Sequence, residues 1–196
     1  MSLVIARKKD GVIYMGADTQ TTFGNGDEKR TMLSKGNIKI CQLPNGIILG
    51  RAGQVHSLQY IWAHPEWFTV PEDGVMTKRH IAENIMPRIY HCFRENDLFD
   101  SDGKEDPLTM GSRLLLAYKD TLFLIDGRLG VCSIENYAAI GAGANFVLYG
   151  LEYPDDSKGV REQIKSLLRV GTEFCPSVSA PFAIVDTATN KIKIER

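Results

Sequence analysis

Short apolar runs separated by turn signals dominate the first quarter of the chain. Residues 3–18 hold two apolar, β-branched runs on either side of Asp10-Gly11, a strong signal for a tight turn, so they predict a β-hairpin. A second hairpin is predicted over residues 38–52, where apolar stretches flank a Pro-Asn-Gly turn. The polar stretch 19–35 between them is expected to be a loop with at most a short strand.

Helical signals follow the second hairpin. Residues 54–63 contain neither Gly nor Pro and Pro65 comes soon after them, which predicts a helix. Thr77 is a suitable N-cap for another helix. Pro87 lies inside its periodic pattern and predicts a kink or a break, because proline lacks the N–H that a helix interior needs. The apolar face of that helix comprises Ile81, Ile85, Ile89, Cys92 and Phe93.

The second half of the chain repeats the order of strands followed by helices. After an acidic loop at 97–107, it predicts a hairpin over 113–125, short strands at 131–134 and 137–140, helices over 145–153 and 160–174, and a closing hairpin over 182–194. One stripe of the last helix carries Val160, Ile164, Leu167, Leu168, Gly171 and Phe174.

This order of elements decides between two fold classes. Strict alternation of strand and helix would favour a doubly wound parallel sheet. Hairpins dominate instead, so the sheets should be mainly antiparallel. Two groups of strands and two helix pairs predict an α+β fold with four layers, αββα, in which two sheets face each other and the helices lie outside. Residues 1–196 are expected to form a single domain.

Composition narrows the class of protein. The chain has 196 residues, 43% of them hydrophobic and 24% charged, with a formal net charge of −1. No general positive field exists, so neither nucleic acid nor an anionic membrane is expected as the main partner. No apolar run reaches the roughly 20 residues that span a bilayer. The start does not resemble a signal peptide. The four cysteines lack zinc spacing, so a cytoplasmic protein with free, mostly buried thiols is expected.

Several familiar catalytic signatures are missing. The sequence has no G-x-S-x-G elbow and no phosphate-binding G-x-x-x-x-G-K-[ST] loop. Gly141-Ala142-Gly143 resembles part of a dinucleotide fingerprint, but Phe146 stands where the third glycine belongs. The four histidines show no metal spacing. We therefore expect no cofactor and no metal.

A different set of polar residues lies at the ends of the predicted strands. Ser2 becomes the first residue if Met1 is removed, Asp18 ends the first hairpin, Lys39 lies in the second, and Gly53 follows its last strand. Adjacent strands could bring these four residues together at one end of a sheet.

The motifs around these residues resemble a known family. Residues 15–22 read MGADTQTT, 35–40 read KGNIKI, 50–53 read GRAG, and 141–144 read GAGA before a predicted helix. In this order they are similar to the proteasome β-subunit family, above all its bacterial HslV-like members, over nearly the whole chain. The resemblance implies the N-terminal nucleophile hydrolase fold, an αββα sandwich, and peptide-bond cleavage inside a ring.

The resemblance also implies roles for individual residues. Ser2 would be the nucleophile, with Asp18 and Lys39 as its charged supports. Thr22 and Gly53 would offer backbone groups to the substrate, the Gly53 N–H lying in the oxyanion hole. Later family positions match loosely: an acid at Glu173, and a serine at Ser177 or Ser179. The implied partners are a peptide or unfolded protein substrate, further copies of the chain in a homo-oligomeric ring, and an ATP-dependent unfoldase as a candidate.

Such a site could activate its nucleophile without a histidine. An N-terminal hydroxyl residue carries its own base, because an α-amino group has a pKa of roughly 8. The ammonium of Lys39 would lower that pKa by like-charge repulsion, and Asp18 would hold Lys39 in place and keep it charged. No histidine is needed.

The sequence departs from the family pattern at its start and in one turn. The family usually begins with Thr followed by Thr or Ser, whereas Leu3 follows Ser2 here and Met1 blocks the Ser2 amine. Ala142 stands where active members often carry serine. Met1-Ser2-Leu3 could derive from a fusion that replaces a native Thr-led start. Three hypotheses remain: a peptidase, a non-catalytic ring or scaffold subunit, and an amidohydrolase of small amides.

Overall fold

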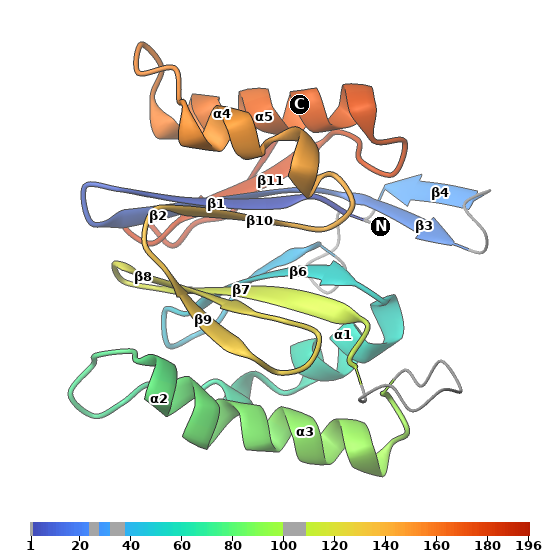
Figure 1. The fold of residues 1–196 in the computed structure, drawn as a ribbon, viewed down its shortest axis with the longest axis vertical. Coiled ribbons are helices and arrows are strands. Elements are labelled where there is room, and N and C mark those ends of the chain that lie inside the picture. Colours follow the sequence, from blue (N-terminus) through green and yellow to red (C-terminus); the bar gives the residue numbers. More distant parts are fainter. Residues whose placement is uncertain (1, 24–27, 32–37, 100–108) are drawn as a thin grey trace.

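The computed structural model describes residues 2–23, 28–31, 38–99 and 109–196. It has four layers, with two sheets face to face between two layers of helices (Figure 1). The predicted αββα architecture is therefore confirmed. No helix of the described residues is long and apolar enough to cross a membrane.

One sheet contains the start of the chain. Its strand order is β10-β1-β2-β11-β12, and every neighbouring pair is antiparallel. Asp10 and Gly11 join β1 to β2 with φ of 52° and 75°, the left-handed geometry of a tight hairpin turn. The strands are β1 (Val4–Lys9), β2 (Val12–Asp18), β10 (Tyr137–Ile140), β11 (Phe182–Asp186) and β12 (Lys193–Glu195).

The second sheet has the order β5-β6-β7-β8-β9 and is also antiparallel throughout. Its strands are β5 (Ile40–Gln42), β6 (Ile48–Gly53), β7 (Ser112–Tyr118), β8 (Thr121–Ile125) and β9 (Val131–Ile134). A two-stranded ribbon of β3 (Gln20–Phe23) and β4 (Glu28–Thr31) lies outside both sheets. The prediction of a loop with at most a short strand was wrong here, because two polar strands pair with each other.

Alternation along the strands divides the apolar residues among three cores. Val4 and Ala6 of β1 belong to the core between the sheets, whereas Ile5 faces the helices. In β6, Ile48 and Ala52 face the other sheet while Leu49 faces the opposite helix layer. This period of two buries both faces of each sheet.

The helices beneath the second sheet follow the predicted order. They are α1 (Val55–Ala63), the 3-10 helix η1 (Pro65–Trp67), α2 (Lys78–His80), the π-helical η2 (Ile81–Ile85) and α3 (Met86–Glu95). The Thr77 side chain accepts a hydrogen bond from the backbone N–H of His80, as expected of an N-cap. Pro87 lies in the first turn of α3, directly after the π-helical turn. The predicted irregularity is thus a local change of helix type.

The helices on the other face are η3 (Ala144–Phe146), α4 (Leu148–Glu152) and α5 (Val160–Phe174). Five residues of the predicted α5 stripe are buried or half-buried, but Phe174 is 62% exposed and stacks on the partly exposed Phe146. Cys175 is the one buried cysteine; Cys41 and Cys92 are half-buried and Cys132 is exposed. The expectation of mostly buried thiols was therefore wrong. The predicted loop at 97–107 falls largely outside the described residues.

Candidate functional site

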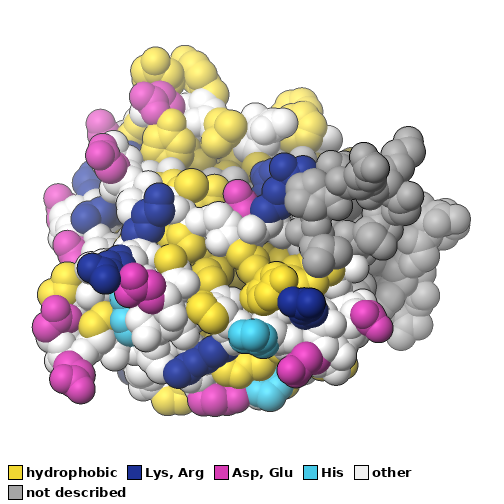
Figure 2. Space-filling model, turned by 60° about the horizontal axis from the view of Figure 1, so that its bottom comes forward, with side chains coloured by type: hydrophobic (Ala, Val, Ile, Leu, Met, Phe, Trp, Pro, Cys, Tyr) yellow, Lys and Arg dark blue, Asp and Glu magenta, His cyan; other side chains and the backbone are white. Residues whose placement is uncertain are grey.

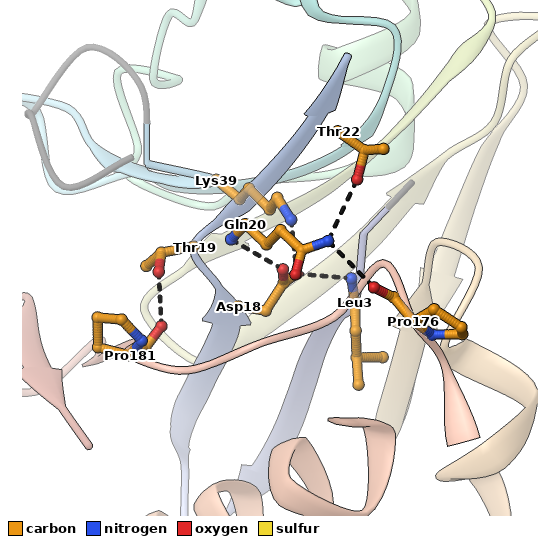
Figure 3. Close-up of polar contacts among 8 residues, drawn as sticks. All are labelled: Leu3, Asp18, Thr19, Gln20, Thr22, Lys39, Pro176 and Pro181. Atoms are coloured by element: carbon orange, nitrogen blue, oxygen red, sulfur yellow. Dashed lines mark hydrogen bonds and ion pairs between the residues drawn. The ribbon is translucent and has the colours of Figure 1, made fainter. Parts of the chain in front are cut away.

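Asp18 organises the polar site at the end of β2. Its side chain is fully buried and accepts three hydrogen bonds. Oδ1 accepts from the Leu3 backbone N–H at 2.9 Å and from Lys39 Nζ at 2.6 Å, and Oδ2 accepts from the Gln20 backbone N–H at 3.1 Å (Figure 3). A single carboxylate thus joins the start of the chain, the strand after it and a lysine of the other sheet.

Lys39 lies directly before β5 rather than within a strand as predicted, and reaches Asp18 from that end of the second sheet. Its carbonyl accepts the Arg51 backbone N–H at 2.9 Å, which holds it beside β6, and the residue is 6% exposed. Burial lowers the pKa of the Lys39 amine, and the attraction of Asp18 only partly offsets this effect. Burial likewise raises the pKa of the Asp18 carboxyl despite its contact with Lys39. Asp18 therefore holds Lys39 in place, and its negative charge opposes the effect of burial on the lysine.

Ser2 lies beside this ion pair, because the amide that binds Asp18 belongs to the next residue. Ser2 is 4% exposed and contributes to the wall of a cleft. Its carbonyl accepts the Gly143 N–H at 3.2 Å. A Cβ on Gly141, whose φ is +98°, would lie 2.1 Å from the same carbonyl oxygen. The GAGA turn therefore packs directly on the start of the chain, which explains its small residues.

Gly53 ends β6 in a conformation that favours glycine, with φ of +140°. A Cβ at this position would lie 2.4 Å from the Gly111 carbonyl oxygen and 2.4 Å from Ser112 Cα, both backbone atoms. The sequence singled out Gly53, and the structure places it in the same cleft as Ser2 and Lys39.

Gln20 belongs to the MGADTQTT motif, but the sequence did not predict it as a site residue. It is 5% exposed, and its Nε2 donates to Thr22 Oγ1 at 3.3 Å and to the Pro176 carbonyl at 3.1 Å (Figure 3). It therefore connects the predicted substrate-binding residue Thr22 with the segment after α5. The neighbouring Thr19 makes a parallel link through its hydroxyl to the Pro181 carbonyl at 2.7 Å.

The three residues that match later family positions loosely lie in different places. Glu173 is exposed on α5 and is not among the described residues that line the cleft, so the structure does not bring it to the site. Ser177 is buried in the segment after α5, next to the Pro176 carbonyl that binds Gln20, and Ser179 is half-buried two residues later. Neither serine lines the cleft among the described residues.

The cleft itself has a volume of about 740 Å³. Its walls come from the start of the chain, β3, the end of β6, the beginning of α1, the beginning of β7, and the turns at 126–128 and 141–142. Sequence reasoning missed Arg51, which lines this cleft and is 5% exposed. The sequence signal for Arg51 was its charge, which interrupts the apolar run 47–52.

Comparisons with known proteins show the fold. No protein-family model and no curated protein sequence matches the chain. BPH of Thiobacillus denitrificans, solved in complex with epoxomicin, superimposes with a TM-score of 0.74 at 17% identity, over 94% of this chain and 97% of that one. HslV of Trypanosoma brucei gives 0.64 at 15% identity, over 94% and 98%.

Anbu, an ancestral β-subunit, of Yersinia bercovieri gives a TM-score of 0.68 at 16% identity, over 98% of this chain and 86% of that one. The chain therefore has the HslV-like and proteasome-like fold of the N-terminal nucleophile hydrolases. This confirms the fold expected from the ordered motifs.

Proposed function

We propose that the chain is a peptidase whose nucleophile is the hydroxyl of Ser2, acting once Met1 has been removed. The observation that supports this most is the meeting of Lys39 Nζ and the Leu3 amide on one buried Asp18 oxygen, directly beside Ser2. A buried ion pair with perturbed pKa values in a cleft is typical of a functional site. The fold of the structural neighbours supports the same conclusion.

The free amine of Ser2 would act as the base. It takes the proton from the Ser2 hydroxyl while Oγ bonds to the carbonyl carbon of the substrate. The Lys39 ammonium lowers the pKa of this amine by repulsion, so more of it is neutral at pH 7.

Negative charge then develops on the carbonyl oxygen of the substrate. We propose that the Gly53 N–H donates a hydrogen bond to this oxygen. Such a donor stabilises the transition state by about 3–4 kcal/mol. The C–N bond breaks, the leaving amine takes the proton from the α-ammonium, and the acyl group stays on Oγ as an ester. Water, deprotonated by the same amine, hydrolyses the ester and restores Ser2.

An exposed apolar patch supports the association of several copies of the chain. An apolar patch formed by η3, α4 and the end of α5 exposes Phe146, Tyr149, Tyr153 and Phe174, with Tyr149 77% exposed. Exposed apolar clusters of this kind mark interaction surfaces. We propose that copies of the chain form a closed ring in the cytosol. Such a ring would shield the cleft from folded proteins and admit peptides or chains unfolded by an ATP-dependent partner.

The test requires a chain with a free residue-2 amine, confirmed by mass spectrometry. We expect turnover of fluorogenic peptides and labelling by a β-lactone, both abolished in Ser2→Ala and in a matched chain that retains Met1. Neither turnover nor labelling in the confirmed free-amine chain would overturn the peptidase proposal.

Ala142 favours the alternative of a non-catalytic scaffold subunit, because its methyl group lines the cleft where a serine hydroxyl could support the nucleophile. A scaffold subunit would assemble into a ring, measured by light scattering, without any turnover. A small-amide hydrolase would cleave acyl amides in preference to peptides, so both substrate classes belong in the assay.

A further inference from the structure

The surface charges of the chain give a peptide substrate little directional guidance. The formal net charge is −1, and Figure 2 shows cationic and anionic side chains interspersed over the face it presents. A face of mixed charge exerts only a weak long-range pull on a peptide of either sign. Short-range contacts inside the cleft are therefore the source of alignment that the structure offers.

Gln20 is a buried amide at the point where β2 passes into β3. It lines the cleft and is 5% exposed. Burying an amide costs free energy unless its polar atoms find hydrogen-bond partners. The Gln20 Nε2 carries two hydrogens and has two acceptors, Thr22 Oγ1 at 3.3 Å and the Pro176 carbonyl oxygen at 3.1 Å (Figure 3). These two bonds form a fork that fixes the position of the side chain and ties two separate segments together.

The backbone of Gln20 serves Asp18 instead. Its N–H donates to Asp18 Oδ2 at 3.1 Å, while Oδ1 of the same carboxylate accepts from Lys39 Nζ and from the Leu3 amide. The main chain and the side chain of Gln20 thus have separate tasks. A substitution at this position removes the side-chain fork but keeps the backbone bond that orients the Asp18 carboxylate.

The strand β3, which Gln20 begins, stands apart from the two large sheets. Among the described residues it pairs with β4 alone, in a ribbon that extends beyond the sheets (Figure 1). Two side chains tie the base of this ribbon to the segment after α5: Gln20 bonds to the Pro176 carbonyl, and Thr19 bonds to the Pro181 carbonyl. The Gln20 link differs from the other because it also includes Thr22, which lines the cleft on β3.

We propose that Gln20 is a positioning residue whose side chain aligns extended peptides with Ser2. This rests on the proposed function and on the expected pairing of the substrate with backbone groups of Thr22. The Gln20 fork holds β3 at a fixed distance from the segment after α5, and it thereby fixes the strand along which a peptide lies. A displacement of about 1 Å at such a site costs about a hundredfold in rate. A substrate too short to reach β3 does not depend on this alignment.

The experiment compares two fluorogenic amides that share a terminal leucine, using the free-amine chain. One is the single-residue amide, which reaches Ser2 but not β3, and the other is a tetrapeptide amide that extends along β3. Gln20→Met keeps the length of the side chain and removes both N–H donors. We expect kcat/KM to fall by about tenfold or more for the tetrapeptide and by less than about threefold for the single-residue amide. The pH profile of the short substrate should not shift, because the backbone bond to Asp18 remains.

Thr19→Val is the matched control, because it removes the parallel link between the same two segments. Thr19 is 1% exposed and is not among the described residues that line the cleft. We expect this variant to lose stability to denaturant as Gln20→Met does, but to keep the ratio of kcat/KM for the tetrapeptide and the single-residue amide within about twofold of its original value. An equal fall of the ratio in both variants overturns the specific role of Gln20.

Thr22→Val tests the same hydrogen bond from its other partner, so the test does not depend on whether Gln20→Met folds. It keeps the backbone groups of Thr22 and removes an acceptor of Gln20 Nε2. We expect the ratio of the two substrates to fall by about three- to tenfold. The double variant should match Gln20→Met, because both changes act through one bond. An unchanged ratio in Gln20→Met and in Thr22→Val overturns the inference and leaves the peptidase proposal intact.

A binding measurement separates this inference from the proposed function. Fluorescence polarisation of the labelled tetrapeptide with the Ser2→Ala chain needs no turnover. In that chain, Gln20→Met should weaken binding by about tenfold, whereas Thr19→Val should leave it within about twofold. This result supports the inference even for an inactive protein. Equal binding with and without the Gln20→Met change, or no measurable binding of the tetrapeptide, overturns it.

Discussion

Lys39 and Arg51 are two buried cations joined by a backbone hydrogen bond, yet their side chains point into different surroundings. Lys39 extends between the sheets to the Asp18 carboxylate at 2.6 Å. Arg51 extends towards the helices and lies over the Trp62 ring. The lysine is therefore held by a carboxylate, whereas the arginine packs on an aromatic ring, and both residues line the same cleft. Two cations of similar burial are thus stabilised in different ways, one by an ion pair and the other by contact with a ring.

The largest expected effect comes from breaking the Lys39 pair. Lys39→Met leaves Asp18 buried without its cation, and we expect a loss of about 3–5 kcal/mol in the free energy of unfolding. In the free-amine chain, kcat should fall by about a thousandfold or more, because both the positioning and the charge beside Ser2 are lost. Denaturant unfolding and peptide kinetics measure the two effects.

The double variant Asp18→Asn/Lys39→Met separates these two roles. Removing both charges should restore most of the stability, since a neutral replacement of a buried ion pair is often neutral or stabilising. Activity should not return. A double variant that regained turnover would show that the pair serves the fold alone.

Gly53→Ala is expected to have the next largest effect. The added Cβ meets backbone atoms of Gly111 and Ser112 at 2.4 Å in a conformation that alanine rarely adopts. We expect a loss of about 1–3 kcal/mol in stability and about a hundredfold in kcat, because the amide proposed for the oxyanion would be displaced. Gly159→Ala is the matched control: nothing lies within 4 Å of its added Cβ, so stability should change by less than about 1 kcal/mol.

The sequence predicted most of the fold because its signals were local. Asp10-Gly11 and the Pro-Asn-Gly turn predicted two hairpins, and the apolar runs predicted the strands of both sheets. The β3–β4 ribbon was missed, since its polar strands carry no alternation to detect. Phe174 was misassigned to the core because helical period alone does not show where the sheet ends beneath a helix.

The site was predictable only in part, for a similar reason. Asp18, Lys39 and Gly53 could be placed because strand ends have defined positions. The roles of Gln20 and Arg51 depend on contacts with Pro176 and Trp62, which are distant in sequence and set by the packing of separate layers.

The buried pair of Asp18 and Lys39 also makes the stability of the fold depend on pH. Burial raises the Asp18 pKa above the ordinary 3.8, so the folded state holds a proton that the unfolded chain has released, and stability falls as pH rises from about 3.8 through the folded pKa. Burial lowers the Lys39 pKa below 10.5, so the unfolded chain holds the extra proton, and stability rises with pH from the folded pKa towards 10.5.

Relative to Asp18→Asn/Lys39→Met, the unmodified chain should therefore be least stable at intermediate pH. The difference in unfolding free energy should be about 1–4 kcal/mol there and should shrink towards both pH extremes. Chemical denaturation over a pH series measures it. A constant difference at all pH values would contradict the assigned directions of both shifts.

The smallest expected effect concerns the support of Arg51. Trp62→Leu removes the aromatic face beneath the guanidinium, and we expect a loss of about 1–2 kcal/mol in stability. Trp67→Leu is the control, because Trp67 stacks on His64 in the same helix layer and does not line the cleft. An equal loss of stability in both variants would mean that it reflects the helix layer as a whole rather than the contact between the Trp62 ring and Arg51.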